Sequence, residues 1–156
     1  MPDDLYWKDI VGWSAAQADR LRRLARGERV NDLDWENLIE EVESVGRSEL
    51  KSVKSLLTRA FEHALKIHGW PGNEAANHWR AEMDAFWRDA RRAMDPGMAQ
   101  HLDIPDLFAE AREAVLGLRT LPPPERALPG RIALAPRDVR DRTIGPDDLL
   151  ARLTGP

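Results

Sequence analysis

The sequence of 156 residues contains no cysteine, so it can form no disulfide framework and carry out no thiol chemistry. It has no apolar run approaching the roughly 20 residues that a membrane-spanning helix needs. Residues 1–15 lack the basic start, apolar stretch and small-residue cleavage site of a secretory signal. These absences lead us to expect a cytoplasmic protein that does not enter a membrane.

Several motifs of catalysis and cofactor binding are also absent. The sequence shows no glycine-rich phosphate loop, zinc-ligand spacing or nucleophile elbow, and we assign it no cofactor. A di-iron site is disfavoured because no glutamate precedes His63, His68, His78 or His101 by three residues. The formal net charge of -4 argues against a general nucleic-acid-binding protein, which usually presents a net basic face.

What is present is helical periodicity over most of the chain. With 42% hydrophobic and 32% charged residues, the composition is that of an ordinary globular domain. Apolar residues recur at helical spacing, and glycine, proline and capping residues punctuate them. The pattern predicts helices over residues 4–26, 35–67, 73–94 and 105–118.

The helix over 35–67 is the longest, and its apolar stripe passes Gly46 without losing phase. Five prolines keep 121–136 out of regular helix, and a last helical turn is expected near 146–153. The fold class is therefore all-α: an irregular bundle of three to four main helices with an extended proline-rich C-terminal segment. We expect a single helical domain over 1–156, with a core in 4–119 and residues 120–156 packed on it.

Residues 33–49, with the sequence LDWENLIEEVESVGRSE, resemble the signature of the bacterial family called domain of unknown function 29. The element His63-Ala64-Leu65-Lys66, the tryptophan Trp79 and the segment from Ile144 to Leu150 also resemble parts of that family. The resemblance implies an all-helical bacterial cytoplasmic protein, and it implies no activity.

An acidic stripe is the first candidate for function. Glu36, Glu40, Glu43 and Arg47 fall on one helix face, because side chains three and four residues apart are neighbours on a helix. The stripe could bind a hard cation through Glu40 and Glu43, or face a basic partner. The alternative is a solvated face on which Glu43 pairs with Arg47.

His63 and Glu49 are polar groups on the apolar side of the same helix. Fourteen residues of helix separate them by about 21 Å, so each needs another partner. His63 could act as a general base or ligand, or it could be a core histidine that bonds a carboxylate or carbonyl of a neighbouring helix. Glu49 and His63 could also contact each other between neighbouring antiparallel helices or across a symmetric dimer.

Three hypotheses for function follow. The first is a non-enzymatic protein-interaction or regulatory domain, favoured by six tryptophans, by the acidic stripe and by the absence of catalytic motifs. The second is a metal-dependent hydrolase or other enzyme that uses Glu40, Glu43 and His63, with Lys66 contributing. The third is nucleic-acid binding through the Arg80–Arg92 face, where Trp79 lies beside arginines; interspersed aspartates make this the least favoured. A homodimer is left open.

Overall fold

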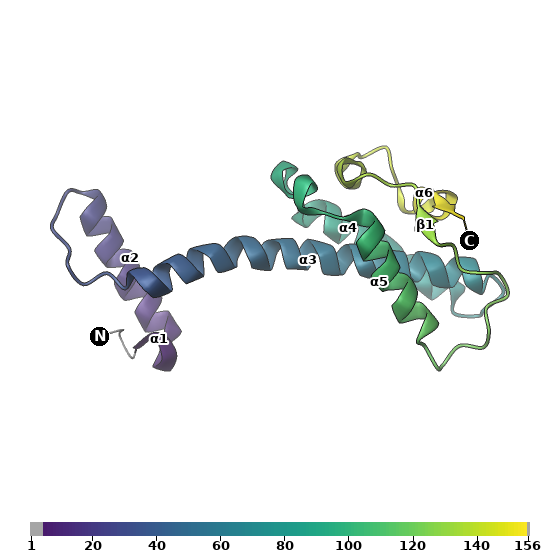
Figure 1. The fold of residues 1–156 in the computed structure, drawn as a ribbon, viewed down its shortest axis with the longest axis horizontal. Helices are drawn as coiled ribbons and strands as arrows, with labels where there is room; N and C mark the ends of the chain where they lie inside the picture. The colour runs from purple at the N-terminus through teal and green to yellow at the C-terminus, as the bar shows by residue number, and fades with distance from the viewer. Residues whose placement is uncertain (1–4, 156) are drawn as a thin grey trace. The chain divides into compact units, whose positions relative to one another are not determined.

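The computed structural model describes residues 5–155 and confirms the all-α fold class (Figure 1). Position 4, where the first helix was expected to begin, lies outside the described residues. The chain divides into two compact units, Met1–Ser48 and Glu49–Pro156, here called the N-terminal and C-terminal units. The single domain over 1–156 stays a prediction. The elements in chain order are α1 Leu5–Lys8, α2 Ile10–Ala25, α3 Trp35–Gly69, α4 Ala76–Ala93, η1 Pro96–His101, α5 Ile104–Leu116, β1 Arg131–Ile132, η2 Pro136–Arg140, α6 Pro146–Ala151 and β2 Leu153–Thr154.

The prediction of one continuous first helix is wrong, because the chain breaks at Asp9 between α1 and α2. The Asp9 side chain accepts a hydrogen bond from the backbone N–H of Gly12 at 2.8 Å, so this residue caps α2 instead of continuing α1. An N-terminal carboxylate also suits the positive end of the helix dipole. The local capping bond outweighed the apolar periodicity that runs across it.

Asp34 organises the N-terminal unit. Its carboxylate accepts hydrogen bonds from the Trp13 indole at 3.0 Å and from the Asn37 side chain at 2.8 Å, and its backbone N–H donates to the Gln17 side chain. A longer bond of 3.4 Å, from the Asn37 backbone N–H to the same carboxylate, caps the start of α3. These bonds hold one face of α2 against the start of α3.

The long helix is confirmed, and it runs through Gly46 without interruption. Nothing lies within 4 Å of the position that a Cβ atom would take at Gly46, so this glycine serves no close packing within the chain. The helix ends at Gly69, two residues beyond the predicted end.

The core lies in the C-terminal unit, where α4 and α5 pack along the second half of α3 (Figure 1). The segment after residue 120 adds four buried apolar side chains to it. Large, fully buried apolar side chains come from all these elements: Val53, Leu57, Phe61 and Leu65 from α3, Met83 and Trp87 from α4, Ile104 and Phe108 from α5, Val139 from η2 and Leu149 from α6.

The first residues of α4 and α5 can be compared with the predicted helix starts. Helix α4 begins at Ala76, later than predicted, because the Asn73 side chain accepts from the Ala75 backbone N–H inside a turn that precedes the helix. Helix α5 begins at Ile104 with Pro105 in its first turn, close to the prediction.

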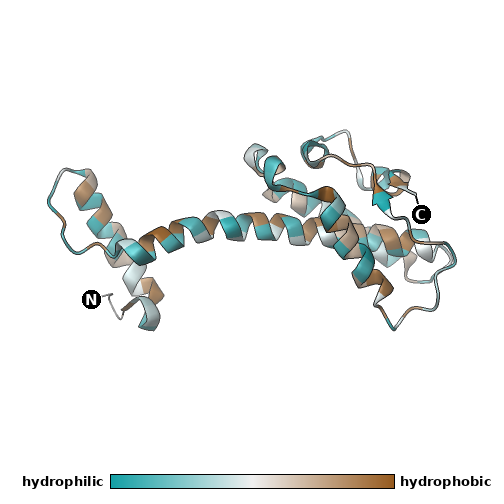
Figure 2. Ribbon diagram, in the orientation of Figure 1, coloured by the Kyte–Doolittle hydropathy of each residue, from teal (hydrophilic) through white to brown (hydrophobic). Residues whose placement is uncertain are grey.

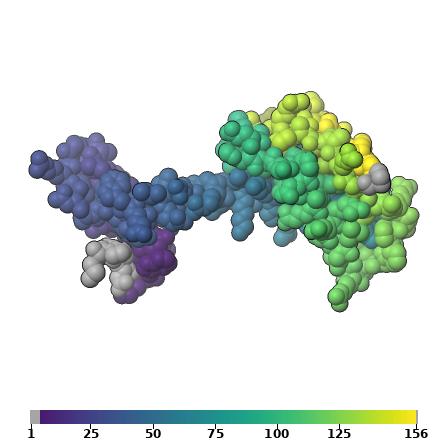
Figure 3. All heavy atoms as spheres, viewed as in Figure 1, coloured from purple at the N-terminus to yellow at the C-terminus, as the bar shows by residue number. Residues whose placement is uncertain are grey.

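The proline-rich part of the C-terminal segment is extended, as predicted, and the short helix α6 follows it. The segment also forms a two-stranded antiparallel sheet, in which Arg131 of β1 pairs with Thr154 of β2. Figure 3 shows this segment, in yellow-green, against α4 and α5. The backbone N–H of Glu125 donates to the Gly69 carbonyl at 2.7 Å, and the Trp70 indole donates to the Pro122 carbonyl at 2.8 Å. These bonds tie the proline-rich chain to the end of α3.

Candidate functional site

His63 is buried between α3 and α4, with 7% of its surface exposed. Its Nδ1 lies 2.8 Å from the Arg59 carbonyl oxygen, and its Nε2 lies 2.6 Å from Oε2 of Glu82. A carbonyl oxygen can only accept, so Nδ1 donates to Arg59, and a proton lies between Nε2 and the carboxylate. His63 thus bonds a carboxylate of a neighbouring helix, as the core-histidine alternative for this residue describes.

Lys66 and Trp79 complete this polar cluster. The Lys66 ammonium lies 3.3 Å from His63 Nε2 and 5.2 Å from the centre of the Trp79 ring, which is within cation–π range. Burial lowers the pKa of Lys66, and the carboxylates of Glu82 and Glu62 oppose that shift. Three residues that the family resemblance picked out, His63, Lys66 and Trp79, are thus brought together.

Burial alone would raise the pKa of Glu82. The hydrogen bond from His63, together with the charges of His63, His78 and Lys66, outweighs it and holds the pKa below its usual value. Sequence reasoning missed Glu82, although it is the one glutamate in α4 and lies three residues after Trp79. Both ring nitrogens of His63 are engaged by the chain itself, so the cluster joins α3 to α4.

The acidic stripe lies on the part of α3 that belongs to the N-terminal unit. Arg47 pairs with Glu40 at 2.7 Å and with Glu43 at 3.6 Å, so the predicted pair with Glu43 is present and Glu40 lies nearer still. Glu36 is exposed, and no ion pair is recorded for it within residues 5–155. Over the same residues, no group of three or more His, Cys, Asp or Glu side chains could hold a metal ion.

Glu49 does not need the partner that the sequence predicted for it, because it is exposed to solvent. His63 is already bonded to Glu82, so Glu49 and His63 do not need each other as partners. Glu49 belongs to the C-terminal unit, as do His63 and Lys66, whereas Glu40 and Glu43 belong to the N-terminal unit.

The N-terminal unit exposes an apolar surface. Val42 is 73% exposed, although it shares its helical stripe with Val53, which is fully buried. The stripe therefore keeps its phase along α3, but Val42 and Val45 in its first half are exposed to solvent. Figure 2 shows hydrophobic residues in brown interspersed with hydrophilic ones along α2 and this part of α3. The N-terminal apolar surface comprises the exposed residues Trp7, Ile10, Val11, Leu21, Leu24, Trp35, Ile39, Val42 and Val45.

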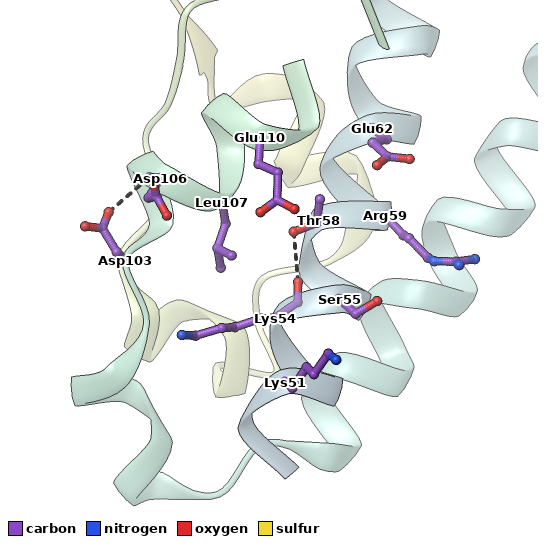
Figure 4. A pocket seen from close by; sticks show the side chains of 10 residues that line it. All are labelled: Lys51, Lys54, Ser55, Thr58, Arg59, Glu62, Asp103, Asp106, Leu107 and Glu110. Atoms are coloured by element: carbon purple, nitrogen blue, oxygen red, sulfur yellow. Dashed lines mark hydrogen bonds between the residues drawn. The ribbon is translucent and has the colours of Figure 1, made fainter. Parts of the chain in front are cut away.

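A cavity of about 500 Å³ lies between α3 and α5 (Figure 4). Lys51 and Lys54 stand on the α3 wall, and Asp106 and Glu110 stand on the α5 wall. Within the described part of the chain, no ion pair of 4 Å or less joins the two walls. Nine of the ten residues that line it carry charged or hydroxyl side chains, and the tenth is Leu107.

Arginines of the Arg80–Arg92 face are used within the chain. Arg91 donates to the backbone carbonyls of Val139, Asp141 and Ile144, and it lies over the ring of Trp87. Others on this helix form looser contacts: Arg80 with Asp147 at 3.4 Å, and Arg92 with Asp89 at 3.9 Å. Arg91 therefore anchors the C-terminal segment to α4.

Comparison with known proteins places this chain in a family. The model of the family described as domain of unknown function DUF29 matches residues 5–141. The chain belongs to this family. It is also similar to a solved structure, an α-helical protein of unknown function from Rhodospirillum rubrum, with 29% identity and a TM-score of 0.66 over 96% of this chain and 98% of that one. No curated protein matches the chain. No helix within residues 5–155 is both long and apolar enough to span a membrane.

Proposed function

We propose that this member of the DUF29 family is a non-enzymatic protein-interaction domain that acts in the bacterial cytoplasm and binds through the N-terminal apolar surface. One observation carries the proposal. Among the described residues, nine of the eleven large hydrophobic side chains that are exposed lie in the N-terminal unit, although that unit holds fewer than a third of the residues. Large exposed apolar patches on soluble proteins commonly mark interaction sites.

The energetics of the unit support the same conclusion. Trp13 is its one buried apolar side chain among the described residues, so its own core is very small. Units of this size rarely gain enough stability from a hydrophobic core alone. Covering a Val, Ile or Trp side chain contributes about 1.5–3 kcal/mol, so covering three or four would exceed what the unit's own core provides. A binding partner would therefore stabilise the unit as well as use it.

The charges beside the N-terminal apolar surface indicate what kind of partner would fit it. Glu36 and Glu43 each follow an apolar residue of the exposed ridge on α3, Trp35 and Val42. An apolar helix edged with arginine or lysine would match this surface in both hydrophobicity and charge. Rim charges of this kind set the choice of partner and the rate of association more than they set affinity.

The two alternative functions have less support. The enzyme hypothesis needs Glu40 and Glu43 to act with His63, but those groups belong to different units, and Arg47 and Glu82 already pair with them. Nucleic-acid binding needs free arginines on α4, whereas the guanidinium of Arg91 is bonded to backbone carbonyls of the same chain.

The test is a pull-down from the native host's lysate with the wild type and two variants. Val42→Asp places a charge in the N-terminal apolar surface, and Leu116→Asp places the same charge on an exposed leucine of α5. Both positions are exposed, so both variants are expected to keep the wild-type circular dichroism. We expect proteins held by the wild type, including tagged copies of the chain itself, to be held by Leu116→Asp and lost by Val42→Asp. Equal retention by all three proteins would contradict the proposal.

A further inference from the structure

We infer that the partner of the N-terminal apolar surface is a second copy of this chain, with α2 of each copy lying on α3 of the other. The inference rests on the proposed function and names its partner. It follows from two exposed helix faces within one unit that differ in side-chain size and in charge.

The face on α3 is a ridge of large side chains with an acidic edge. Trp35, Ile39 and Val42 recur at spacings of four and three, so they form one line along the helix, and each is more than half exposed. Glu36, Glu40 and Glu43 lie along one side of that line with Arg47, which pairs with Glu40 at 2.7 Å and with Glu43 at 3.6 Å. Three carboxylates to one guanidinium leave that side negative. The ridge thus has large apolar side chains along its centre and negative charge along one edge.

The face on α2 has the opposite character. Val11, Ala15, Ala18 and Arg22 also recur at spacings of four, three and four, and Val11 is 75% exposed. Its two middle residues are small alanines, so this line stands lower than the ridge and is called the α2 groove below. Arg22 is exposed and has no recorded ion pair among residues 5–155. Small side chains allow a neighbouring helix to approach closely, and ridges of large residues pack into such grooves.

Within residues 5–155, the hydrogen bonds that hold α2 to α3 use the other side of that helix. Trp13 and Gln17 hold α2 to the start of α3 through Asp34, and on a helical wheel they lie opposite the line of Val11, Ala15 and Ala18. Each copy therefore offers one ridge with a negative edge and one groove that carries a positive residue.

A two-fold symmetric pair satisfies both faces at once. In such an interface, if the α2 groove of one copy contacts the α3 ridge of the other, the reverse contact also forms. The pair buries the ridge twice and brings Arg22 of each copy to the acidic edge of the other. Ridge-on-ridge pairing would instead bring the glutamates of the two copies together, which like charges disfavour.

Two charge-reversal variants and their mixture test the inference by analytical ultracentrifugation. One variant is Arg22→Glu, and the other is the double change Glu36→Arg/Glu43→Arg. The wild type is expected to be a dimer. Each variant alone places like charges at both contacts, so its self-association should weaken by at least about tenfold. An equimolar mixture should recover the dimer, because both contacts between unlike copies regain opposite charges.

The control is Arg119→Glu, an exposed arginine outside the N-terminal unit, which should leave the dimer unchanged. Circular dichroism of each variant checks that the helices are retained. A wild type that stays monomeric, variants that dimerise like the wild type, or a mixture that stays monomeric would each overturn the inference. If the wild type is monomeric and Val42→Asp still abolishes capture of another protein, the proposed function stands and only the second copy is rejected.

Discussion

Removing the Glu82 carboxylate should destabilise the C-terminal unit measurably. The change is Glu82→Ala, which deletes the partner of His63 Nε2 without harming α4, since alanine is the best helix former. A hydrogen bond to a charged group contributes about 1.5–3 kcal/mol. The Glu82 side chain is 38% exposed, so solvent screening reduces the expected loss to about 1–2 kcal/mol.

Thermal unfolding followed by circular dichroism measures this loss. For a chain of this size, 1 kcal/mol corresponds to about 2–4 °C in the midpoint, so a decrease of roughly 2–8 °C is expected. The matched control is His78→Ala, which removes an exposed imidazole that lies 3.4 Å from the other Glu82 oxygen and should change stability by less than about 0.5 kcal/mol. Equal midpoints for Glu82→Ala and the wild type would refute the view that this cluster joins α3 to α4.

The same pair predicts a dependence on pH. Because the pKa of Glu82 is lower in the folded chain, its carboxylate contributes stability above the pKa that it has in the unfolded chain. That contribution is lost as the pH falls through the folded pKa. The difference between the wild type and Glu82→Ala should therefore be full at neutral pH and should vanish in strongly acidic solution.

Two further predictions concern single positions. Gly69→Ala should lower the free energy of unfolding in urea by about 1–3 kcal/mol, because its Cβ would lie 2.6 Å from a methyl carbon of Leu128. Gly46→Ala lies in open space on the same helix, and it should raise the free energy of unfolding by about 0.5–1 kcal/mol. A loss at Gly46 equal to that at Gly69 would contradict this reasoning. Asp34→Ala should detach α2, because it removes the acceptor of the Trp13 indole, and hydrogen exchange should then rise across α2 while the helices of the C-terminal unit keep their protection.

Local patterns in the sequence determined most of the helices. Repetition at three and four residues fixed the long helix, and the proline-rich stretch fixed where regular helix stops, because both depend on bonds and clashes between near neighbours. The break at Asp9 and the late start of α4 were not predicted, although both depend on bonds between residues that are close in the sequence. In both places a short capping or turn bond competed with the periodicity.

Tertiary structure alone decided which parts of those helices are buried and which polar groups meet. Val42 and Val53 occupy the same stripe of α3, but only Val53 belongs to the buried core that α4, α5 and the C-terminal segment build with α3. The sequence predicted that His63 needs an acceptor, yet its partner Glu82 is 19 residues away on another helix. Periodicity reports which residues share a face, whereas burial depends on what packs against that face, and that is set by contacts between distant segments.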